Sequence, residues 1–280
     1  MTWHIIGGNS YIAQRLLPKL NGEHVVTYGR SRENNQVFLD LTDIDPNAYK
    51  EIKNGDFVVF FAAVSSPDIC QKQYDSAYAL NVTGTEIFIQ GCLKTHAKVL
   101  FFSSDAVLGT ASGDETAEPS PIGNYAKMKR IVETDFCGEK DLKVFRLSYV
   151  FSRQDKFTRY LRECQRNNTV ANVYDALYRN VVYIEDLIDA ITALSKSFDR
   201  WENQIFHICG DELLSRKDIA EIYRKETGGM FQYITSIPDS TFFEARPNRI
   251  EMKSKYFSSL LGKTPTRIAE AMHLEAERIG

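Results

Sequence analysis

Short apolar runs alternate with helical patterns from the first residues of this chain, and this alternation restricts its fold more than any other feature. In the first 150 residues, strand-like runs occur at Trp3–Ile6, His24–Tyr28, Val37–Leu41, Asp56–Phe61, Val99–Phe102 and Lys143–Ser148. Helical patterns follow several of them, one running to Leu20 and another opening at Thr42-Asp43. Strands separated by helices are typical of a parallel sheet with helices on its faces. The sequence therefore predicts an α/β protein with a doubly wound parallel sheet.

The alternation weakens after Val150, which indicates a second, smaller part of the chain. Helices are expected at Phe157–Arg166, from Ile184, at Ser215–Thr227 with Ser215 as the N-cap, and at Arg267–Arg278; strands are expected at Thr169–Tyr174, Asn180–Tyr183, Gln204–Cys209 and Tyr233–Ile237. The first two of these strands are expected to pair. We predict a nucleotide-binding domain at residues 1–150 and a substrate-binding lobe at 151–280. Because no long linker separates the two parts, we expect the lobe to be partly interleaved with the sheet.

The composition excludes several classes of function. A net charge of −3 on 280 residues argues against a general nucleic-acid binder, which carries a basic surface. No apolar run approaches the roughly 18 residues of a membrane span, and a strand signal begins almost where a signal peptide would lie. The five cysteines and five histidines are scattered without metal-binding spacing. We therefore expect a cytoplasmic protein with reduced cysteines, without a metal, and without a membrane or nucleic-acid partner.

The segment after the first strand is a candidate dinucleotide-binding turn. In such a turn, glycines let the backbone approach a pyrophosphate at the N-terminus of the following helix. Gly7 suits the tight turn and Ala13 suits close packing of the helix, but Ser10 stands where a middle glycine is usual. Taken alone, the motif fits a plain turn equally well. As part of a Rossmann-type fold, it predicts cofactor contacts from Gly7, Asn9, Ser10, Tyr11 and Ile12.

The end of the second strand indicates which cofactor is bound. An acidic residue there would bind the adenosine ribose of NAD, whereas this chain has Arg30-Ser31-Arg32. Two guanidinium groups and a hydroxyl suit a 2′-phosphate, so NADP(H) is favoured over NAD(H); a solvated basic turn is the alternative. Further cofactor contacts are expected near the ends of neighbouring strands, from Asp40, Leu41, Ala62, Ala63 and Val64.

An asparagine and a glycine interrupt the helical pattern that follows the fourth strand. Asn81 and Gly84 are both unfavourable inside an otherwise apolar helix. Their presence predicts a packing or hydrogen-bonding role at this point, and Asn81 is counted among the residues expected around the cofactor.

The stretch from Val99 to Lys129 carries residues suited to acid–base chemistry. An apolar strand signal ends at Ser103-Ser104, and a helical pattern then carries Tyr125 and Lys129 four positions apart, on one helix face. A hydroxyl at a strand end that faces such a pair could form a proton-transfer site. The same Tyr/Lys spacing recurs at Tyr49/Lys53, so the spacing alone does not select the pair.

Several motifs of the chain resemble those of the extended short-chain dehydrogenase/reductase family. Gly7-x-x-Ser10-x-x-Ala13, Asn81-Val-Thr-Gly-Thr, Ser104 and Tyr125-x-x-x-Lys129 resemble its cofactor and catalytic motifs, and the segments beginning at Arg179 and Arg246 resemble its C-terminal ones. Leu39–Asp43, Phe102–Gly109 and Val144–Phe151 are most similar to the dTDP-4-dehydrorhamnose reductase branch. The matches span nearly the whole chain in the expected order, which favours Tyr125/Lys129 over Tyr49/Lys53.

The resemblance implies an NADPH-dependent reductase of a nucleotide-linked 4-keto-6-deoxy sugar, and homodimers are common in the family. Tyr125 would act as the acid, Lys129 would lower the pKa of Tyr125 and bind the nicotinamide ribose, and Ser104, rather than Ser103, would orient the carbonyl. Tyr149 would lie beside the nicotinamide. The substrate would contact Ser65, Ser104, Asp105, Arg179 and Arg246. The two arginines would bind its diphosphate; surface salt bridges are the alternative for them.

Departures from the family pattern leave two other functions open. The nucleotide loop lacks its second and third glycines, Ala106 replaces an aromatic residue, and Lys253 replaces an acid. A nucleotide-sugar 4-epimerase with retained NAD is one alternative, although Arg30 and Arg32 stand where such an enzyme usually has an acid. A non-catalytic NADP-binding regulatory protein is the other.

Overall fold

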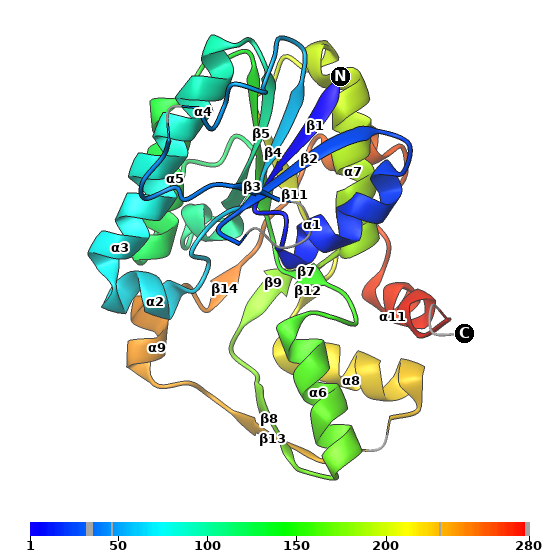
Figure 1. Cartoon of the computed structure of the whole chain (residues 1–280). Helices are drawn as coiled ribbons and strands as arrows, with labels where there is room; N and C mark the ends of the chain where they lie inside the picture. The colour runs from blue at the N-terminus through cyan, green and yellow to red at the C-terminus, as the bar shows by residue number, and fades with distance from the viewer. Residues whose placement is uncertain (32–35, 46, 230, 278–280) are drawn as a thin grey trace.

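A seven-stranded parallel sheet forms the centre of the molecule (Figure 1). The structure is a computed structural model that describes residues 1–31, 36–45, 47–229 and 231–277. The sheet strands are β1 (Thr2–Ile6), β2 (His24–Gly29), β3 (Val37–Phe38), β4 (Phe57–Phe60), β5 (Lys98–Ser104), β6 (Leu142–Leu147) and β11 (Ile205–Ile208). They lie in the order β11-β6-β5-β4-β1-β2-β3, and all neighbouring pairs are parallel. Because the chain builds outward in both directions from β1, the sheet is doubly wound and the predicted fold class is confirmed.

Helices cover both faces of this sheet (Figure 1). The α-helices are α1 (Tyr11–Leu16), α2 (Pro67–Lys72), α3 (Tyr74–Tyr78), α4 (Thr85–Lys94), α5 (Asn124–Asp135), α6 (Lys156–Asn167), α7 (Ile184–Ser197), α8 (Arg216–Thr227), α9 (Ser240–Glu244), α10 (Phe257–Leu261) and α11 (Ile268–Glu277). α4 and α5 pack on one face, and α1 and α7 pack on the other. Successive strand residues point to opposite faces of the sheet. Ile5 and Val59 therefore lie in the core beneath α7. Their neighbours Ile6 and Phe60 lie in the core beneath α4.

The third strand and the segment after it differ from the sequence prediction. β3 comprises Val37–Phe38 instead of 37–41, and the residues from Thr42 onward form turns instead of a helix. The Asp40 carboxylate accepts hydrogen bonds from the amide and the hydroxyl of Thr42, at 2.9 and 2.7 Å. The carboxylate of Asp45 binds the amide of Asn47 in the same way. Such side-chain-to-backbone bonds compete with helix formation, which explains the turns.

Short strands from the second half of the chain form three small sheets in the lobe. β7 (Val150–Phe151) pairs with β10 (Val182–Tyr183), β9 (Tyr178–Asn180) lies between β12 (Leu213–Leu214) and β14 (Arg249–Ile250), and β8 (Ala171–Tyr174) pairs with β13 (Tyr233–Ser236). The expected pairing of 169–174 with 180–183 is therefore wrong, because β8 has its partner in β13. β11 follows residue 150 and still completes the main sheet, so the division of the chain at that residue stays a proposal.

Candidate active site

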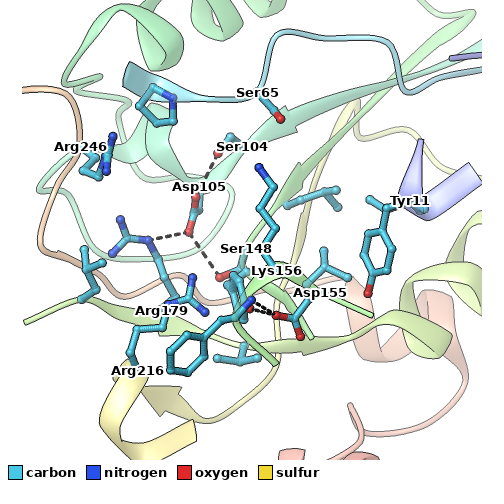
Figure 2. Close-up of a pocket in the computed structure, with 18 of the residues that line it drawn as sticks. Tyr11, Ser65, Ser104, Asp105, Ser148, Asp155, Lys156, Arg179, Arg216 and Arg246 are labelled. Atoms are coloured by element: carbon cyan, nitrogen blue, oxygen red, sulfur yellow. Dashed lines mark hydrogen bonds and ion pairs between the residues drawn. The ribbon is translucent and has the colours of Figure 1, made fainter. Parts of the chain in front are cut away.

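A large cavity lies where the carboxyl ends of the sheet strands face the lobe (Figure 2). Its volume is about 1170 Å³, and residues from both parts of the chain line it. Open parallel sheets bind their ligands at this edge. The cavity brings together many of the predicted site residues: Ser10, Tyr11, Ile12, Ala63, Ser65, Ser104, Asp105, Tyr125, Lys129, Tyr149, Arg179 and Arg246.

Tyr125 enters the cavity from the first turn of α5. Burial, and then the charge of Asp105, raise the pKa of Tyr125, and the nearby Ser104 hydroxyl opposes this shift only weakly. The phenol is therefore kept protonated and able to donate a proton. Lys129 was expected to lower the pKa of Tyr125; in this structure the net shift is upward, because desolvation dominates.

The Lys129 ammonium, one helical turn after Tyr125, is directed toward the sheet. Its Nζ donates a hydrogen bond to the Phe102 carbonyl at 2.8 Å and lies 4.5 Å from the centre of the Phe101 ring. Burial lowers the pKa of Lys129 to about 8, although the nearby Glu133 opposes the shift. Lys129 is therefore mostly charged at neutral pH and loses its charge in mildly alkaline solution.

The two serines at the end of β5 have different surroundings. The Ser104 hydroxyl donates to Asp105 Oδ1 at 3.0 Å and accepts from the Ala106 amide at 3.2 Å, and it lies close enough to Tyr125 to affect the pKa of that phenol. The Ser103 hydroxyl is buried and has no hydrogen-bond partner in the described part of the chain. These contacts favour Ser104 as the hydroxyl that acts together with Tyr125.

The second Tyr-x-x-x-Lys pair has a different environment. Tyr49 lies in a turn, and its ring centre is 5.7 Å from that of Phe88 on α4. Lys53 lies outside any helix, so the two side chains do not share a helix face. This pair is part of the packing beside α4 and does not line the large cavity.

Asn81 lies in a single π-helical segment, Ala79–Gly84, between α3 and α4. π-Helical turns inside α-helices often occur at functional sites. The Asn81 side chain is buried, accepts a hydrogen bond from the Val64 amide at 2.8 Å and donates to the Val64 carbonyl at 3.0 Å. A Cβ on Gly84 would lie 1.7 Å from the Leu41 carbonyl oxygen. The expected hydrogen-bonding and packing roles are confirmed: Asn81 supports the strand end at Val64, and Gly84 lets Leu41 approach.

Replacing Asn81 with alanine should destabilise the protein by about 1–3 kcal/mol, because the Val64 amide and carbonyl lose their partner inside the protein. Urea denaturation of the variant measures this free energy. The exposed Asn47, whose side chain donates a hydrogen bond to the nearby Asp45, provides the matched control, N47A, with a change below about 0.5 kcal/mol. An N81A variant as stable as N47A would show that the two bonds to Val64 contribute nothing.

The turn after β1 has the geometry expected for close approach of a dinucleotide. Gly7 has a φ of +86°, and a Cβ there would lie 2.9 Å from the Ala62 amide nitrogen. The Ser10 hydroxyl caps α1 by accepting a hydrogen bond from the Ala13 amide at 3.2 Å. The serine that replaces the usual glycine thus stabilises the helix start, and Tyr11 and Ile12, in the first turn, line the cavity. These residues fit a cofactor pyrophosphate.

Several other predicted cofactor residues, among them Asn9, Arg30 and Leu41, do not line this cavity. Asn9 donates a hydrogen bond to Ser31 at 3.4 Å, which joins the first turn to the end of β2. Arg30 is exposed and its charge acts on Asp40. Leu41 and Asn81 are buried and support neighbouring segments; Arg32 lies outside the described residues. Sequence reasoning missed Gln36, whose amide group donates to Asn9 beside Gly29.

Arg179 lies in the cavity, and several of its donors already have acceptors within the protein. Its Nε lies 3.2 Å from Asp105 Oδ2, and its two terminal nitrogens donate to the carbonyls of Tyr178 and Pro247, each at 2.7 Å. Burial lowers the pKa of Arg179 and raises that of Asp105, while each charge opposes the shift of the other. The diphosphate role expected for Arg179 stays a prediction, and these contacts argue that it shapes the cavity wall.

Arg246 forms an ion pair with Asp68, which joins the loop before β14 to α2. Its guanidinium also stacks 4.0 Å from the centre of the Phe242 ring. Arg246 therefore forms the salt bridge that was named as the alternative to a phosphate contact. The predicted diphosphate role of Arg246 stays a prediction.

Three cavity cations were missed by sequence reasoning: Lys156, the first residue of α6, Arg159, one turn further along it, and Arg216, the first residue of α8. The helix starts could be read from the sequence, since Ser215 and Asp218 form the expected capping box of α8. That both starts face the same cavity depends on the folding of the lobe against the sheet (Figure 2).

The described residues show neither a metal-type cluster of three or more His, Cys, Asp or Glu side chains nor a helix long and apolar enough to cross a membrane.

Comparison with known families gives a match along almost the whole chain. Residues 1–278 match the model of the RmlD substrate binding domain family. Among curated proteins, dTDP-4-dehydrorhamnose reductase of Mycobacterium tuberculosis (strain ATCC 25618 / H37Rv) is 26% identical over 239 residues, which cover 81% of this chain and 78% of the relative.

Solved structures share the fold at lower identity. A dTDP-4-dehydrorhamnose reductase from Bacillus anthracis in complex with NADP has a TM-score of 0.84 at 18% identity, with 100% of this chain and 99% of that chain covered. A UDP-glucose 4-epimerase from Thermotoga maritima has a TM-score of 0.80 at 20% identity, with 100% and 98% covered. Because reductases and epimerases both superpose, the fold does not by itself separate the two activities.

Proposed function

The chain belongs to the RmlD substrate binding domain family, within the extended short-chain dehydrogenases/reductases, and from this premise we propose that it reduces a nucleotide-linked 4-keto-6-deoxy sugar with NADPH. As a family member it is an NAD(P)-dependent oxidoreductase. The observation that carries the proposal is the grouping of Tyr125, Lys129 and Ser104 in one cavity with the dinucleotide turn. The proposed homodimer and cytoplasmic location rest on the family resemblance and the scattered cysteines.

The proposed chemistry is ketone reduction with Tyr125 as the proton donor. NADPH, when bound, supplies the hydride that is added to the carbonyl carbon. Tyr125 gives its proton to the carbonyl oxygen as negative charge develops there. The Ser104 hydroxyl, by turning its single proton from Asp105 to the substrate, donates a hydrogen bond that orients this oxygen. Lys129 adds a positive charge one helical turn away, which stabilises the developing negative charge. One hydride and one proton convert the ketone to an alcohol.

The rate of reduction should fall above about pH 8, because Lys129 then loses the positive charge that supports Tyr125. Below this pKa, Lys129 is protonated and kcat/KM should be independent of its titration. The measurement is a pH profile of kcat/KM between about pH 6 and 10. The variant K129R keeps its charge over this range, so it should be slower but lack the alkaline fall. A wild-type profile that is flat through pH 9 would contradict this role of Lys129.

The proposed preference for NADPH rests on the basic end of β2. Arg30 is exposed and its charge acts on Asp40, while Ser31 is tied to Asn9 of the first turn. This places a cation beside the segment where the adenosine ribose of a dinucleotide lies in a Rossmann fold.

Replacing Arg30 with alanine should raise the KM for NADPH about 10- to 100-fold, the loss expected for a charge-assisted bond. The KM for NADH, which lacks the 2′-phosphate, should change less than about twofold. Steady-state kinetics with both cofactors measure this, with R200A, at an exposed arginine elsewhere, as the matched control. Equal effects on NADPH and NADH would reject a 2′-phosphate contact.

Screening 4-keto sugar nucleotides for NADPH oxidation tests the proposed function directly. The alternative, a 4-epimerase, would retain NAD through gel filtration and interconvert sugar epimers without net oxidation. Dissociable NADPH together with net reduction supports the reductase, whereas bound NAD detected in the spectrum of the purified protein supports the epimerase.

A further inference from the structure

A second cavity lies among α6, α8 and α11, which are neighbouring helices in the second half of the chain (Figure 1). Its volume is about 870 Å³, within the range of ~300–1,000 Å³ that is usual for small-molecule sites. Gln154 and Arg159 line both cavities, and the other residues that line the second cavity do not line the first. The second cavity is therefore a separate space that adjoins the candidate active site near the start of α6.

Arginines gather around the second cavity. Arg153 precedes α6, and Arg162 and Arg166 lie one turn apart on the face of α6 that also carries Arg159. None of these four guanidinium groups forms an ion pair with a described carboxylate. Like charges three or four positions apart repel and weaken a helix. A negatively charged ligand in the cavity would relieve this repulsion.

The glutamates that line the cavity do not neutralise these arginines. Glu163 lies four positions after Arg159 and three before Arg166, yet it forms no ion pair with either. Glu226 lies 3.8 Å from the ammonium of Lys225. Both carboxylates could have been placed against the arginines of α6, and the structure directs them elsewhere.

The third glutamate, Glu275, fixes the wall between α11 and the segment before α6. Its Oε1 accepts hydrogen bonds from Arg15 Nη2 at 2.5 Å and from the Tyr183 hydroxyl at 3.0 Å. Its Oε2 accepts a hydrogen bond from the Arg153 amide at 3.1 Å. The Arg153 carbonyl in turn accepts a hydrogen bond from Arg162 Nη1 at 3.3 Å. These bonds hold the backbone that carries the arginines, so the site is largely formed before a ligand arrives.

The floor of the second cavity is apolar and partly aromatic. Phe151, Met272 and Tyr223 line it and are buried. Burial raises the pKa of Tyr223, and the charges of Arg162 and Arg153 oppose the shift, so both guanidinium groups lie near this phenol. Cations around an apolar floor suit a ligand that combines phosphate groups with a less polar part.

We propose that the second cavity binds a small molecule that carries a diphosphate, either free pyrophosphate or the diphosphate of a nucleotide. A guanidinium group binds phosphate oxygens in bidentate fashion. Arg153, Arg162 and Arg166 supply three such groups from two neighbouring segments, which matches two linked phosphates better than one. The site lies away from Tyr125 and does not depend on which substrate the active site reduces.

Calorimetric titration with inorganic pyrophosphate, ADP and adenosine, at constant ionic strength, tests this proposal. The protein is saturated with NADPH so that ADP cannot occupy the cofactor site. The variant R162Q/R166Q should bind pyrophosphate and ADP at least about 100-fold more weakly than wild type, the loss of two charge-assisted bonds, and R166Q alone about 10-fold more weakly. R224Q, at an exposed arginine of α8 that lines neither of these cavities, is the matched control. Circular dichroism checks that each variant is folded.

The variant R246Q separates the two cavities, because Arg246 lines the first and not the second. Pyrophosphate binding that persists in R246Q and is lost in R162Q/R166Q supports the proposal. Binding that is lost in R246Q and unchanged in R162Q/R166Q, an equal loss in R224Q, or no binding to wild type at millimolar pyrophosphate overturns it. With the same dependence on Arg162 and Arg166, tighter binding of ADP than of pyrophosphate supports a nucleotide as the ligand, and equal affinities support the free diphosphate. Adenosine that binds as tightly as ADP would overturn the diphosphate assignment.

Discussion

Replacing Tyr125 with phenylalanine should lower kcat for ketone reduction by about 100- to 10,000-fold, the range expected for the loss of a general acid. The ring and its packing stay, so the fold and NADPH affinity should change little. Burial keeps the Tyr125 phenol protonated, and the phenol lines the cavity together with Ser104, so the variant loses a positioned proton donor. Single-turnover measurement of NADPH oxidation, with NADPH affinity measured by fluorescence titration, gives both quantities.

The second Tyr-x-x-x-Lys pair supplies a matched control for this experiment. Y49F removes a hydroxyl from a ring that packs against Phe88, away from the cavity, and should leave kcat unchanged. If Y125F lost no activity relative to Y49F, Tyr125 would not be the acid. If the Y125F variant bound NADPH normally and kept the biological role of the protein, the result would instead support the non-catalytic regulatory alternative.

Replacing Arg146 with methionine should lower the free energy of unfolding by about 3–5 kcal/mol, the cost of leaving a buried carboxylate without its partner. Arg146 Nε and Nη2 donate to the two oxygens of Glu133 at 3.0 and 2.7 Å, and the exposed fractions of the two side chains are 1% and 0%. This bidentate pair joins α5 to β6. Glu133 lies one turn after Lys129, so the pair also fixes the helix that carries Tyr125.

Chemical denaturation measures this loss against a control at the same carboxylate. Arg130 approaches Glu133 Oε2 at 3.2 Å from a partly exposed position, so R130A should cost less than about 1 kcal/mol. The double variant R146M/E133L, which removes both buried charges, should recover most of the stability lost in R146M. If R146M and R130A were equally stable, or if the double variant recovered no stability, the unpaired charge of the buried Glu133 would not be the cause of the loss in R146M.

The helix that carries Tyr125 and Lys129 could be predicted from the sequence because the relevant information is local. Tyr125 and Lys129 are four positions apart, and an α-helix brings such residues to one face whatever surrounds it. Strand alternation likewise predicted the parallel sheet, and the capping box at Ser215 predicted the start of α8. Local hydrogen bonds also caused one error: the carboxylates of Asp40 and Asp45 form turns where the apolar pattern suggested a helix.

The partners of the charged residues could not be predicted, because they come from distant parts of the chain. Arg179 could be recognised as a candidate phosphate ligand, but the carbonyl of Pro247, 68 positions away, occupies one of its donors. Asp105, which follows the end of β5, lies beside Arg179 and forms an ion pair with its guanidinium group. Conversely, nothing in the sequence distinguishes Arg216 from other helix-surface arginines. Only the packing of α8 against Tyr149 leaves its Nη1 buried and without a hydrogen-bond partner among the described residues.

By itself, the sequence therefore determined the fold class and the family, and it placed Tyr125 and Lys129 on one helix, since periodicity, helix caps and motifs can be read along the chain. The tertiary structure alone decided the charge balance of the cavity. Whether an arginine binds a ligand or supports the wall depends on which acceptors the fold brings within hydrogen-bond distance, and those acceptors are remote in the chain.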